Sequence, residues 1–370
     1  MKYYLIAGEA SGDLHGSNLM KELKKTDALA QFRFCGGDLM KAQGGEMVIH
    51  YSRMSFMGLV EILMNSKRIY ENFRICKKDL LENQPDAIIL IDYPGFNFRM
   101  ATFAKKHGIK VFYYISPHLW AWKKGRMKTI KKYFDKLFVI LPFEVDFFKL
   151  HHCAVDFVGN PVADAVDDFK KNIKTDDFRQ KNNLSEKPIV ALLAGSRVQE
   201  IEKCLPEMLK TVTSYTDYQF VIAGAPSIHL SFYQKIIKDT KVALVQNQTY
   251  ALLSNAHAAV VTSGTATLET ALFNVPQIVI YKLNEISLFL ARKMIKIKYF
   301  SLVNLIRDKP VVKELLQYNL SEGIRIELKL LLYDDDYRNR MMTEYELIRG
   351  KIGQHASQKT AQLIYKYLSS

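Results

Sequence analysis

The sequence is poor in cysteine and in long hydrophobic runs, and each shortage excludes a class of protein. Its four cysteines form no C-x-x-C pair, which argues against a disulfide framework and a structural zinc site and favours a reducing compartment. No run approaches the roughly 18 uncharged apolar residues of a membrane-spanning helix. The first apolar run is followed at once by Glu9 and Asp13, so we predict a buried strand there and no signal peptide. We expect a protein that is soluble or bound to a membrane surface.

Acidic residues are fewer than basic ones. The 370 residues include 52 Lys and Arg against 38 Asp and Glu, which gives a formal net charge of +14. This excess favours an anionic partner or surface without naming it. Hydrophobic residues make up 48% of the chain, so it can bury real cores, and its length fits about two domains of ordinary size.

Short apolar runs alternate with amphipathic segments in both halves of the chain. Such runs are typical of parallel strands that helices cover on both sheet faces, so we predict an α/β fold with two doubly wound, Rossmann-like domains. A polar segment, 163–187, separates the halves, and the chain after residue 281 has a helical pattern. The predicted domains are 1–165 and 166–345, followed by a helical segment 346–370. The predicted strands are 3–7, 87–91, 111–115, 137–141, 189–194, 220–223, 242–245, 258–262 and 278–281.

Two loops of the first half carry acids after predicted strands, where ligands bind in such sheets. In the first, glycines permit a tight turn, and two acids favour a hydroxyl-rich ligand over a phosphate; its candidate residues are Glu9, Ser11, Gly12 and Asp13. In the second, Asp92 precedes a Pro-Gly turn and could accept a proton from a substrate hydroxyl. The alternative in both loops is an ordinary capped helix start or turn.

Two loops of the second half favour phosphate. The first is Gly195, Ser196 and Arg197, where backbone N–H groups, a helix dipole and a guanidinium come together. The second contains Thr262, Ser263, Gly264 and Thr265, with Glu269 about one turn into the next helix, where it could accept two ribose hydroxyls. The alternative is a well-capped helix with an acid near its start. We expect a nucleotide donor in the second domain and the acceptor and base in the first.

The segment 55–68 differs from the rest of the chain, because it has a broad apolar face and a basic end. This pattern suits an interfacial helix or an acyl-chain groove. The residues are Phe56, Met57, Leu59, Val60, Leu63, Lys67 and Arg68, and Trp120 and Trp122 add an aromatic platform. The alternatives are a core helix and an interdomain packing loop. Neither 151–153 (His-His-Cys) nor 334–336 (Asp-Asp-Asp) predicts a metal site, because adjacent side chains converge poorly and the acids belong to a solvated turn.

The motifs taken together resemble those of the lipid-A-disaccharide synthase family. Two positions depart from the family pattern: Ala194 replaces a usual Pro, and Asn160 replaces a usual His, which puts a proton-transfer role there in doubt. The matching pieces occur in family order: GEASGDLHG (8–16), GG-x-x-M (36–40), MSFMGLVEIL (54–63), IDYPGFN (91–97), YYISPHLWAW (113–122), LPFE (141–144), AGSR-x-x-EI (194–201), TSGTATLE (262–269) and SLVNL (301–305).

The resemblance implies a GT-B glycosyltransferase with its active site between two Rossmann-like domains and a C-terminal helix that packs back on the first. The implied reaction joins UDP-2,3-diacylglucosamine to 2,3-diacylglucosamine 1-phosphate in a β-1,6 linkage and releases UDP, as a step of lipid A biosynthesis. The resemblance also implies a cytoplasmic enzyme bound peripherally to the inner face of the inner membrane of a Gram-negative-type bacterium. We expect no cofactor, no metal and no nucleic-acid partner; whether the chain forms a homodimer is left open.

The resemblance also implies roles for single residues. Asp92 matches the family's catalytic acid position and would be the base. Arg197 and the amides of 263–265 would stabilise the departing UDP, Glu269 would hold the ribose, and Asn304 matches a polar position near the donor. Glu9, Ser11 and Asp13 would orient sugar hydroxyls.

Two other functions compete with this one. A UDP-N-acetylglucosamine 2-epimerase-like enzyme shares the fold and the ribose-binding acid, but it needs no lipid surface. A non-catalytic nucleic-acid-binding protein would explain the charge and leave the loop chemistry unexplained.

Overall fold

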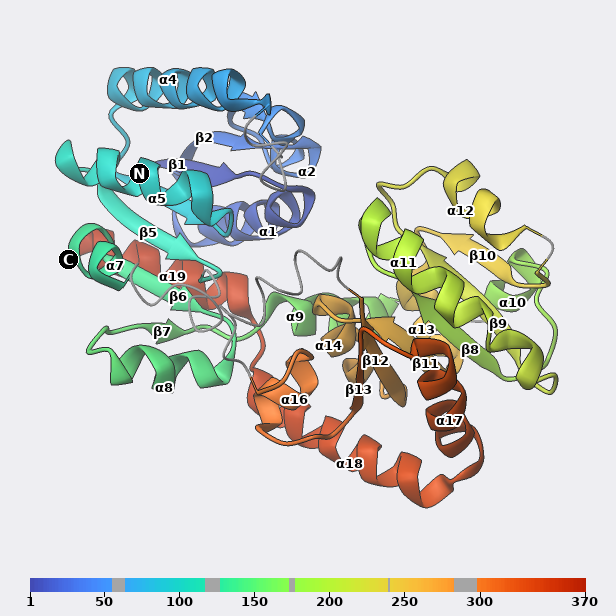
Figure 1. Ribbon diagram of the computed structural model, residues 1–370. Helices are drawn as coiled ribbons and strands as arrows, with labels where there is room; N and C mark the ends of the chain where they lie inside the picture. The colour runs from blue at the N-terminus through green and yellow to red at the C-terminus, as the bar shows by residue number, and fades with distance from the viewer. Residues whose placement is uncertain (55–63, 117–126, 173–176, 239, 283–297) are drawn as a thin grey trace. The chain divides into compact units, whose positions relative to one another are not determined.

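The computed structural model describes residues 1–54, 64–116, 127–172, 177–238, 240–282 and 298–370. The described chain divides into two compact units (Figure 1). Unit 1 comprises Met1–Pro161 and Gly353–Ser370, and unit 2 comprises Val162–Ile352. The chain therefore leaves unit 1 after Pro161 rather than after residue 165, and returns at Gly353 rather than at 346, because the preceding helix continues to Ile352.

Unit 1 is built on a seven-stranded sheet of order β3-β2-β1-β4-β5-β6-β7, in which every neighbouring pair is parallel. Its strands are β1 (Lys2–Ala7), β2 (Gln31–Gly36), β3 (Glu46–His50), β4 (Ala87–Ile91), β5 (Lys110–Tyr114), β6 (Lys136–Val139) and β7 (Asp156–Phe157). Its helices are α1 (Ala10–Thr26), α2 (Asp38–Ala42), η1 (Tyr51–Arg53), α4 (Ser66–Asn83), α5 (Pro94–Lys106), α7 (Met127–Tyr133), α8 (Pro142–Leu150) and α19 (Ala356–Ser369).

Side chains alternate between two apolar layers along each strand of unit 1, since successive residues of a strand point to opposite sheet faces. On β1, Tyr4 and Ile6 pack toward α4, α5, α7 and α8, whereas Tyr3 and Leu5 pack toward α1 and α19. The C-terminal helix α19 contributes Ala361 and Ile364 to the second layer. Helices thus cover both faces of a parallel sheet, which is the doubly wound arrangement.

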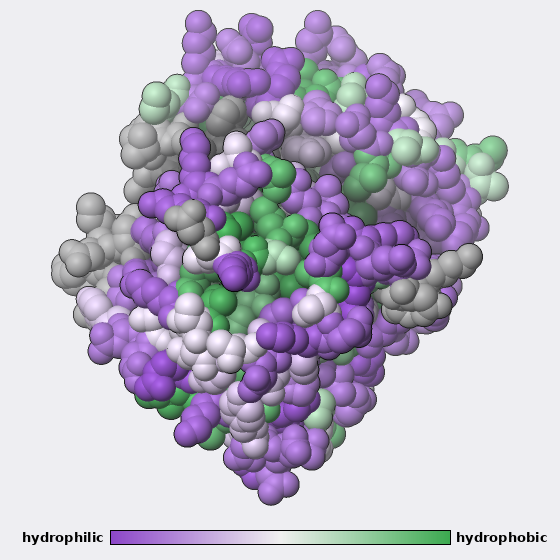
Figure 2. All heavy atoms as spheres, turned by 90° about the vertical axis from the view of Figure 1, so that its right-hand side faces the viewer, coloured by the Kyte–Doolittle hydropathy of each residue, from purple (hydrophilic) through white to green (hydrophobic). Residues whose placement is uncertain are grey.

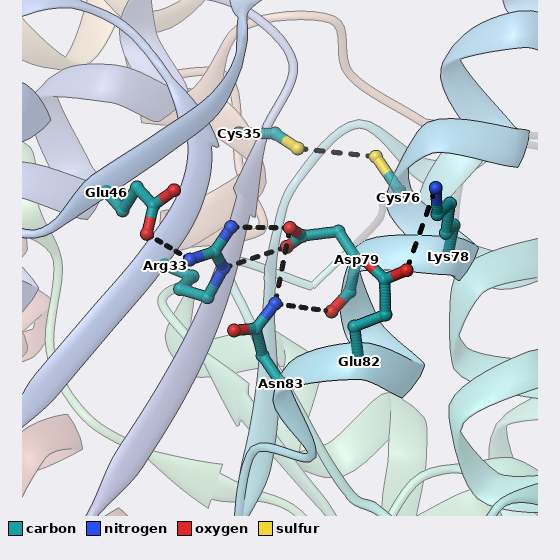
Figure 3. Close-up of polar contacts among 8 residues, drawn as sticks. All are labelled: Arg33, Cys35, Glu46, Cys76, Lys78, Asp79, Glu82 and Asn83. Carbon is teal, nitrogen blue, oxygen red and sulfur yellow. Dashed lines mark hydrogen bonds and ion pairs between the residues drawn. The ribbon is translucent and has the colours of Figure 1, made fainter.

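Helix α4 is fixed to the sheet by buried and charged contacts (Figure 3). Arg33 of β2 donates to both carboxylate oxygens of Asp79, with Nε 3.0 Å from Oδ2, and also pairs with Glu46 of β3. Beside this pair, the Sγ atoms of Cys35 and Cys76 lie 3.3 Å apart as free thiols. One face of α4 is therefore held against β2, and the opposite face is free to carry exposed charge.

Unit 2 is built on a six-stranded sheet of order β10-β9-β8-β11-β12-β13, again parallel throughout. Its strands are β8 (Ile189–Leu193), β9 (Gln219–Gly224), β10 (Ala243–Gln246), β11 (Ala256–Thr262), β12 (Gln277–Tyr281) and β13 (Lys313–Leu316). Its helices are α9 (Pro161–Asn172), α10 (Phe178–Lys181), α11 (Val198–Leu209), η4 (Val212–Ser214), α12 (Leu230–Ile237), α13 (Thr249–Asn255), α14 (Thr265–Leu272), α16 (Leu302–Arg307), α17 (Leu320–Tyr333) and α18 (Asp335–Ile352). Two doubly wound parallel α/β units confirm the predicted fold class.

Two glycines meet where the chain leaves and re-enters unit 1. Gly159 has φ +92°, a conformation that favours glycine. A Cβ built on Gly353 would come within 2.9 Å of the Cα of Gly159. Asn160 is buried and donates through Nδ2 to the carbonyl of Ile140 at 3.2 Å. This residue, which departs from the family pattern, therefore fixes the chain crossing.

Hydrophilic side chains dominate the face seen in Figure 2, with hydrophobic ones gathered near its centre. Among the described helices, none is long and apolar enough to cross a membrane.

Candidate functional site

The loops after β1 and β4 lie against each other at the carboxyl edge of the unit 1 sheet, because these strands are neighbours. The ring of Tyr93 covers Gly8, where an added Cβ would come within 2.3 Å of it. Tyr93 also donates through its hydroxyl to the carbonyl of Met54. The predicted acid loop and the predicted base loop are thus in contact through the ring of Tyr93.

Asp92 begins a backbone turn that non-glycine residues rarely adopt. Asp92 and Tyr93 have φ of +43° and +48°, in the left-handed region. The carbonyl of Asp92 accepts hydrogen bonds from Asn97 Nδ2 at 2.7 Å and from the Tyr113 hydroxyl. Asn97 Nδ2 also donates to the carbonyl of Ile91 at 3.2 Å. The surrounding side chains therefore fix this turn at the end of β4.

The carboxyl group of Asp92 is less acidic than an ordinary aspartate. Burial raises its pKa to about 6, while the backbone N–H of Tyr93 acts in the opposite direction. A carboxylate with this pKa is ionised at neutral pH and is a stronger base than an exposed one. Perturbed carboxyls at the ends of strands are candidates for acid–base roles.

Asp13 is placed differently from Glu9, the other acid of the first loop. It is buried, and its Oδ1 accepts from the N–H groups of Gly37 at 2.7 Å and Met40 at 3.1 Å, while Oδ2 accepts from Leu39 at 3.1 Å. Its carboxylate therefore caps α2. Glu9, the N-terminal flanking residue of α1, is partly exposed and Ser11 is exposed, whereas Gly12 is buried against Ala7.

The loop after β8 contains Glu200, a motif residue to which the sequence pattern assigned no role. Glu200 folds back so that Oε2 accepts from the Ser196 N–H at 3.1 Å and Oε1 lies 3.2 Å from Arg197 Nη1. A Cβ on Gly195 would meet Glu200 Oε2 at 2.6 Å, and Gly195 has φ +112°, so this position favours glycine. The side chain of Arg197 remains 58% exposed. The spacing of Arg197 and Glu200, three residues at a helix start, resembles a capping box and could have indicated this contact.

The loop after β11 leaves its glycine open to solvent. Among the described residues, no atom lies within 4 Å of a Cβ built on Gly264, and Thr265 is exposed at the start of α14. Ser263 instead turns to the protein: its N–H donates to the carbonyl of Ile280 at 2.9 Å and its hydroxyl to that of Phe300 at 3.0 Å. Thr262 is buried. Gly264 and Thr265 therefore form the approachable part of the loop.

Glu269 lies on α14 and accepts a hydrogen bond from the Tyr250 hydroxyl, 2.8 Å from Oε1. Burial raises the pKa of Glu269, and the Tyr250 hydrogen bond acts against that rise. Tyr250 is 19 residues away in the sequence, so spacing alone could not have paired the two.

Asn304 is buried, and its side chain is fully occupied within the protein. The amide nitrogen donates to the Val312 carbonyl and to Glu314 Oε1, both at 2.9 Å. The amide oxygen accepts from the N–H groups of Val311 and Val312. Glu314 in turn accepts from the N–H groups of Phe300 and Ser301. Asn304 therefore organises residues 300–314, which include the carbonyl that Ser263 contacts.

Most of the predicted lipid-contacting residues lie outside the described part of the chain. These are Phe56, Met57, Leu59, Val60, Leu63, Trp120 and Trp122. Lys67 and Arg68 are described, and both are exposed on the first turns of α4. Ala194, the second departure from the family pattern, is buried at the end of β8.

Solved structures of similar fold were found over nearly the full chain. UDP-GlcNAc 2-epimerase from Neisseria meningitidis, solved with UDP-GlcNAc, is 15% identical with a TM-score of 0.70 and 100% of both chains covered. MurG from Acinetobacter baumannii is 14% identical with a TM-score of 0.59 and 99% of both chains covered. At these identities the likeness shows the fold alone, and the two doubly wound units define a protein of the GT-B class.

The sequence comparisons are more specific. The family model described as lipid-A-disaccharide synthetase matches residues 3–367. The lipid-A-disaccharide synthase of Coxiella burnetii (strain CbuG_Q212) is 37% identical over 373 aligned residues, covering 99% of this chain and 98% of the relative. That of Syntrophus aciditrophicus is 38% identical, covering 94% and 93%. The chain belongs to the lipid-A-disaccharide synthase family, and it is a glycosyltransferase of lipid A biosynthesis. The family match favours this activity over the epimerase alternative.

Proposed function

We propose that the protein transfers the diacylglucosamine of UDP-2,3-diacylglucosamine to 2,3-diacylglucosamine 1-phosphate, with inversion at the transferred carbon. The single observation that carries the catalytic part is the placement of Asp92, a partly buried carboxylate of raised pKa on a fixed turn at the end of β4. Unit 1 would supply this base, and unit 2 would hold the UDP portion of the donor.

In the proposed step, the 6-hydroxyl oxygen of the acceptor attacks C1 of the donor sugar. The hydroxyl proton passes to Asp92, the new C–O bond forms, and the bond from C1 to the β-phosphate oxygen breaks. The electron pair of that bond leaves with UDP. A general base in this position typically contributes about 10²–10⁴-fold in rate, because a neutral alcohol is a poor nucleophile.

Unit 2 offers positive and hydrogen-bonding groups for the departing diphosphate. The exposed guanidinium of Arg197 and the open backbone at Gly264 and Thr265 follow two neighbouring parallel strands, β8 and β11. A cation and backbone amides at a helix start stabilise phosphate charge. Glu269, five residues after Gly264 and on the helix that begins there, would accept the ribose hydroxyls.

The test is mass spectrometry of products after the pure protein is incubated with both acylated substrates and EDTA. We expect a tetraacylated disaccharide phosphate and UDP. The Asp92→Asn variant should form at least 100-fold less product and bind UDP as the unaltered protein does. Loss of UDP binding in that variant would reject the assignment of base and donor to different units, and absence of product from the unaltered protein would reject the activity.

We further propose that unit 1 binds anionic lipid surfaces through the face formed by α4, α5 and α7. These three helices cover one apolar layer of the sheet and together carry eleven Lys and Arg against three acids. Lys128, Lys131 and Lys132 of α7 are exposed. Each basic residue near an anionic membrane contributes about 1 kcal/mol of binding free energy.

Sedimentation with vesicles tests this surface. Replacing Lys128, Lys131 and Lys132 with Gln should weaken binding to phosphatidylglycerol vesicles at least tenfold and leave the weak binding to phosphatidylcholine vesicles unchanged. The matched control replaces Lys235, Lys238 and Lys241, three exposed lysines of unit 2, with Gln. Equal losses in the two triple variants would show that only net charge matters and would reject this face.

A further inference from the structure

A tyrosine outside the sequence motifs contacts the acid proposed to hold the ribose. Tyr250 is the second residue of α13, and its hydroxyl donates to Glu269 Oε1 on α14 at 2.8 Å. The hydrogen bond joins two helices that are separated by strand β11 in the chain. This contact fixes which of the two carboxylate oxygens turns toward α13.

The Tyr250 ring is held by two other aromatic rings. Its centroid lies 5.4 Å from that of Phe169 on α9 and 5.2 Å from that of Phe273, the residue after α14. Phe169 and Phe273 also contact each other, with centroids 5.8 Å apart. Lys170 ties α9 to the end of α14 by donating to the carbonyl of Leu272 at 2.8 Å. The hydroxyl of Tyr250 is therefore presented to Glu269 from a rigid three-ring cluster.

A carboxylate that must accept hydrogen bonds from a ribose gains from such a partner in two ways. An ionised carboxylate has about four acceptor positions on two oxygens, so a hydrogen bond at Oε1 leaves Oε2 entirely available. The same hydrogen bond removes the freedom of the carboxylate to rotate, and fixing a group in its binding geometry lowers the entropy lost when the ligand binds. Donation to a charged acceptor also makes this bond stronger than one between neutral groups.

We infer that Tyr250 is a positioning residue that sets the preference of the donor site for a ribose with free hydroxyl groups. It acts through Glu269 and does not itself contact the ligand. The inference rests on the proposed function, since it takes Glu269 as the acceptor of the ribose hydroxyls.

The experiment compares two ligands in five forms of the full-length protein. UDP and 2′,3′-dideoxy-UDP are titrated calorimetrically into the unaltered protein, Tyr250→Phe, Glu269→Gln, the double variant and Tyr218→Phe. Phenylalanine keeps the ring contacts of Tyr250 and removes only the donor. Tyr218→Phe is the matched control, because Tyr218 also lies in unit 2 and donates to an oxygen, the Leu332 carbonyl, at 3.0 Å.

We expect the unaltered protein and Tyr218→Phe to prefer UDP over the dideoxy ligand by the same factor. Tyr250→Phe should lower that factor about three- to tenfold, which is less than the tenfold or more expected for loss of a direct hydrogen bond to a charged group, because Tyr250 acts on the ligand only through Glu269. Glu269→Gln should remove most of the preference, and the double variant should equal Glu269→Gln.

Three results would overturn the inference, and they differ in what else they reject. An unchanged preference in Tyr250→Phe with a lost preference in Glu269→Gln would reject only the role of Tyr250. Equal weakening of both ligands in Tyr250→Phe would show that the tyrosine supports the fold alone. An unchanged preference in Glu269→Gln would reject the proposed ribose contact as well.

Discussion

The hydroxyl of Tyr113 donates a hydrogen bond to the backbone carbonyl of Asp92. Tyr113 lies on β5 and Asp92 follows β4, so the neighbouring strand holds the turn that presents the proposed base. Asn97 donates to the same carbonyl from within α5. Two buried side chains thus balance the cost of a left-handed aspartate, which is of order 1–3 kcal/mol for such backbone conformations.

Removing these donors should lower turnover without removing the base. We predict that Asn97→Ala, which loses two hydrogen bonds, reduces kcat at least tenfold and lowers the free energy of unfolding by about 2–3 kcal/mol. Tyr113→Phe, which loses one, should have a smaller effect of the same kind. Steady-state kinetics and urea unfolding measure both effects. Asn83→Ala is the control, because the hydrogen bonds of that side chain go to Asp79 in the same helix, α4; a kcat loss there equal to that of Asn97→Ala would contradict the prediction.

The raised pKa of Asp92 predicts the acid side of the pH–rate profile. The base acts when ionised, so kcat/KM should fall about tenfold per pH unit below about 6 and level off above it. An Asp with an ordinary pKa would place this bend near pH 4. The profile is measured between pH 4.5 and 8.5 in buffers of constant ionic strength. Glu269→Gln should lower the rate and leave the bend of the profile near pH 6. If the bend shifts or disappears in this variant, Glu269 rather than Asp92 is the group that titrates there.

The same shift predicts a stability cost at neutral pH. The folded pKa of Asp92 lies above its unfolded value, so the fold disfavours the ionised form, and this cost is fully present above about pH 6 and absent below about pH 4. Asp92→Asn should therefore be more stable than the unaltered protein at pH 8, by up to about 3 kcal/mol, and equally stable at pH 4. Urea unfolding at the two pH values measures the difference. If Asp92→Asn is less stable than the unaltered protein at pH 8, the ionised carboxylate stabilises the fold and the prediction is wrong.

Gly8 and Gly95 provide a matched pair of substitutions. A Cβ on Gly8 would lie within 2.6 Å of three atoms of the Tyr93 ring, whereas one on Gly95 would have no atom of the described part of the chain within 4 Å. Gly8→Ala should displace Tyr93 and the Asp92 turn and lower kcat at least tenfold, and Gly95→Ala should change the free energy of unfolding by no more than about 1 kcal/mol. Steady-state kinetics and thermal unfolding of both variants measure these two effects. Similar activity in the two would show that Tyr93 can move without affecting the base.

We expect Asn304 to contribute to the stability of the fold rather than to direct contact with the donor. Asn304→Ala removes four hydrogen bonds from residues 300–314, and we predict a loss of about 2–4 kcal/mol in the free energy of unfolding. Asn255→Ala, which removes one hydrogen bond within a helix, should lose about 1 kcal/mol or less. Thermal unfolding measures the difference. Weaker UDP binding with unchanged stability in Asn304→Ala would instead place this side chain against the donor.

The sequence predicted every interior strand of the described sheets except β2, and of their four edge strands it predicted β10 alone. The run 87–91 coincides with β4, because a strand buried on both faces is apolar throughout. Strands β3 and β13 lie at sheet edges and carry Glu46 and Lys313, so their sequences show no apolar run. Strand β2 was missed because the charged Arg33 interrupts it, and that charge is matched by Asp79 of α4, a partner distant in the sequence.

The sequence indicated where the motif residues lie better than it indicated which groups they contact. Gly264 and Asp92 lie at strand ends as the pattern indicated. Asp13 and Asn304, taken from the sequence as ligand contacts, are occupied by backbone groups of their own unit. No spacing rule reveals such contacts, because their partners come from other elements.

The return of the chain to unit 1 has a consequence for its synthesis. Ala356, Ala361 and Ile364 of α19 complete the apolar layer that contains Tyr3 and Leu5 of β1. Unit 2 is one continuous stretch, Val162–Ile352, and its residues are all translated before those of α19. Strand β1 must therefore wait for α19, so translation that stops after unit 2 leaves unit 1, rather than unit 2, without a finished core.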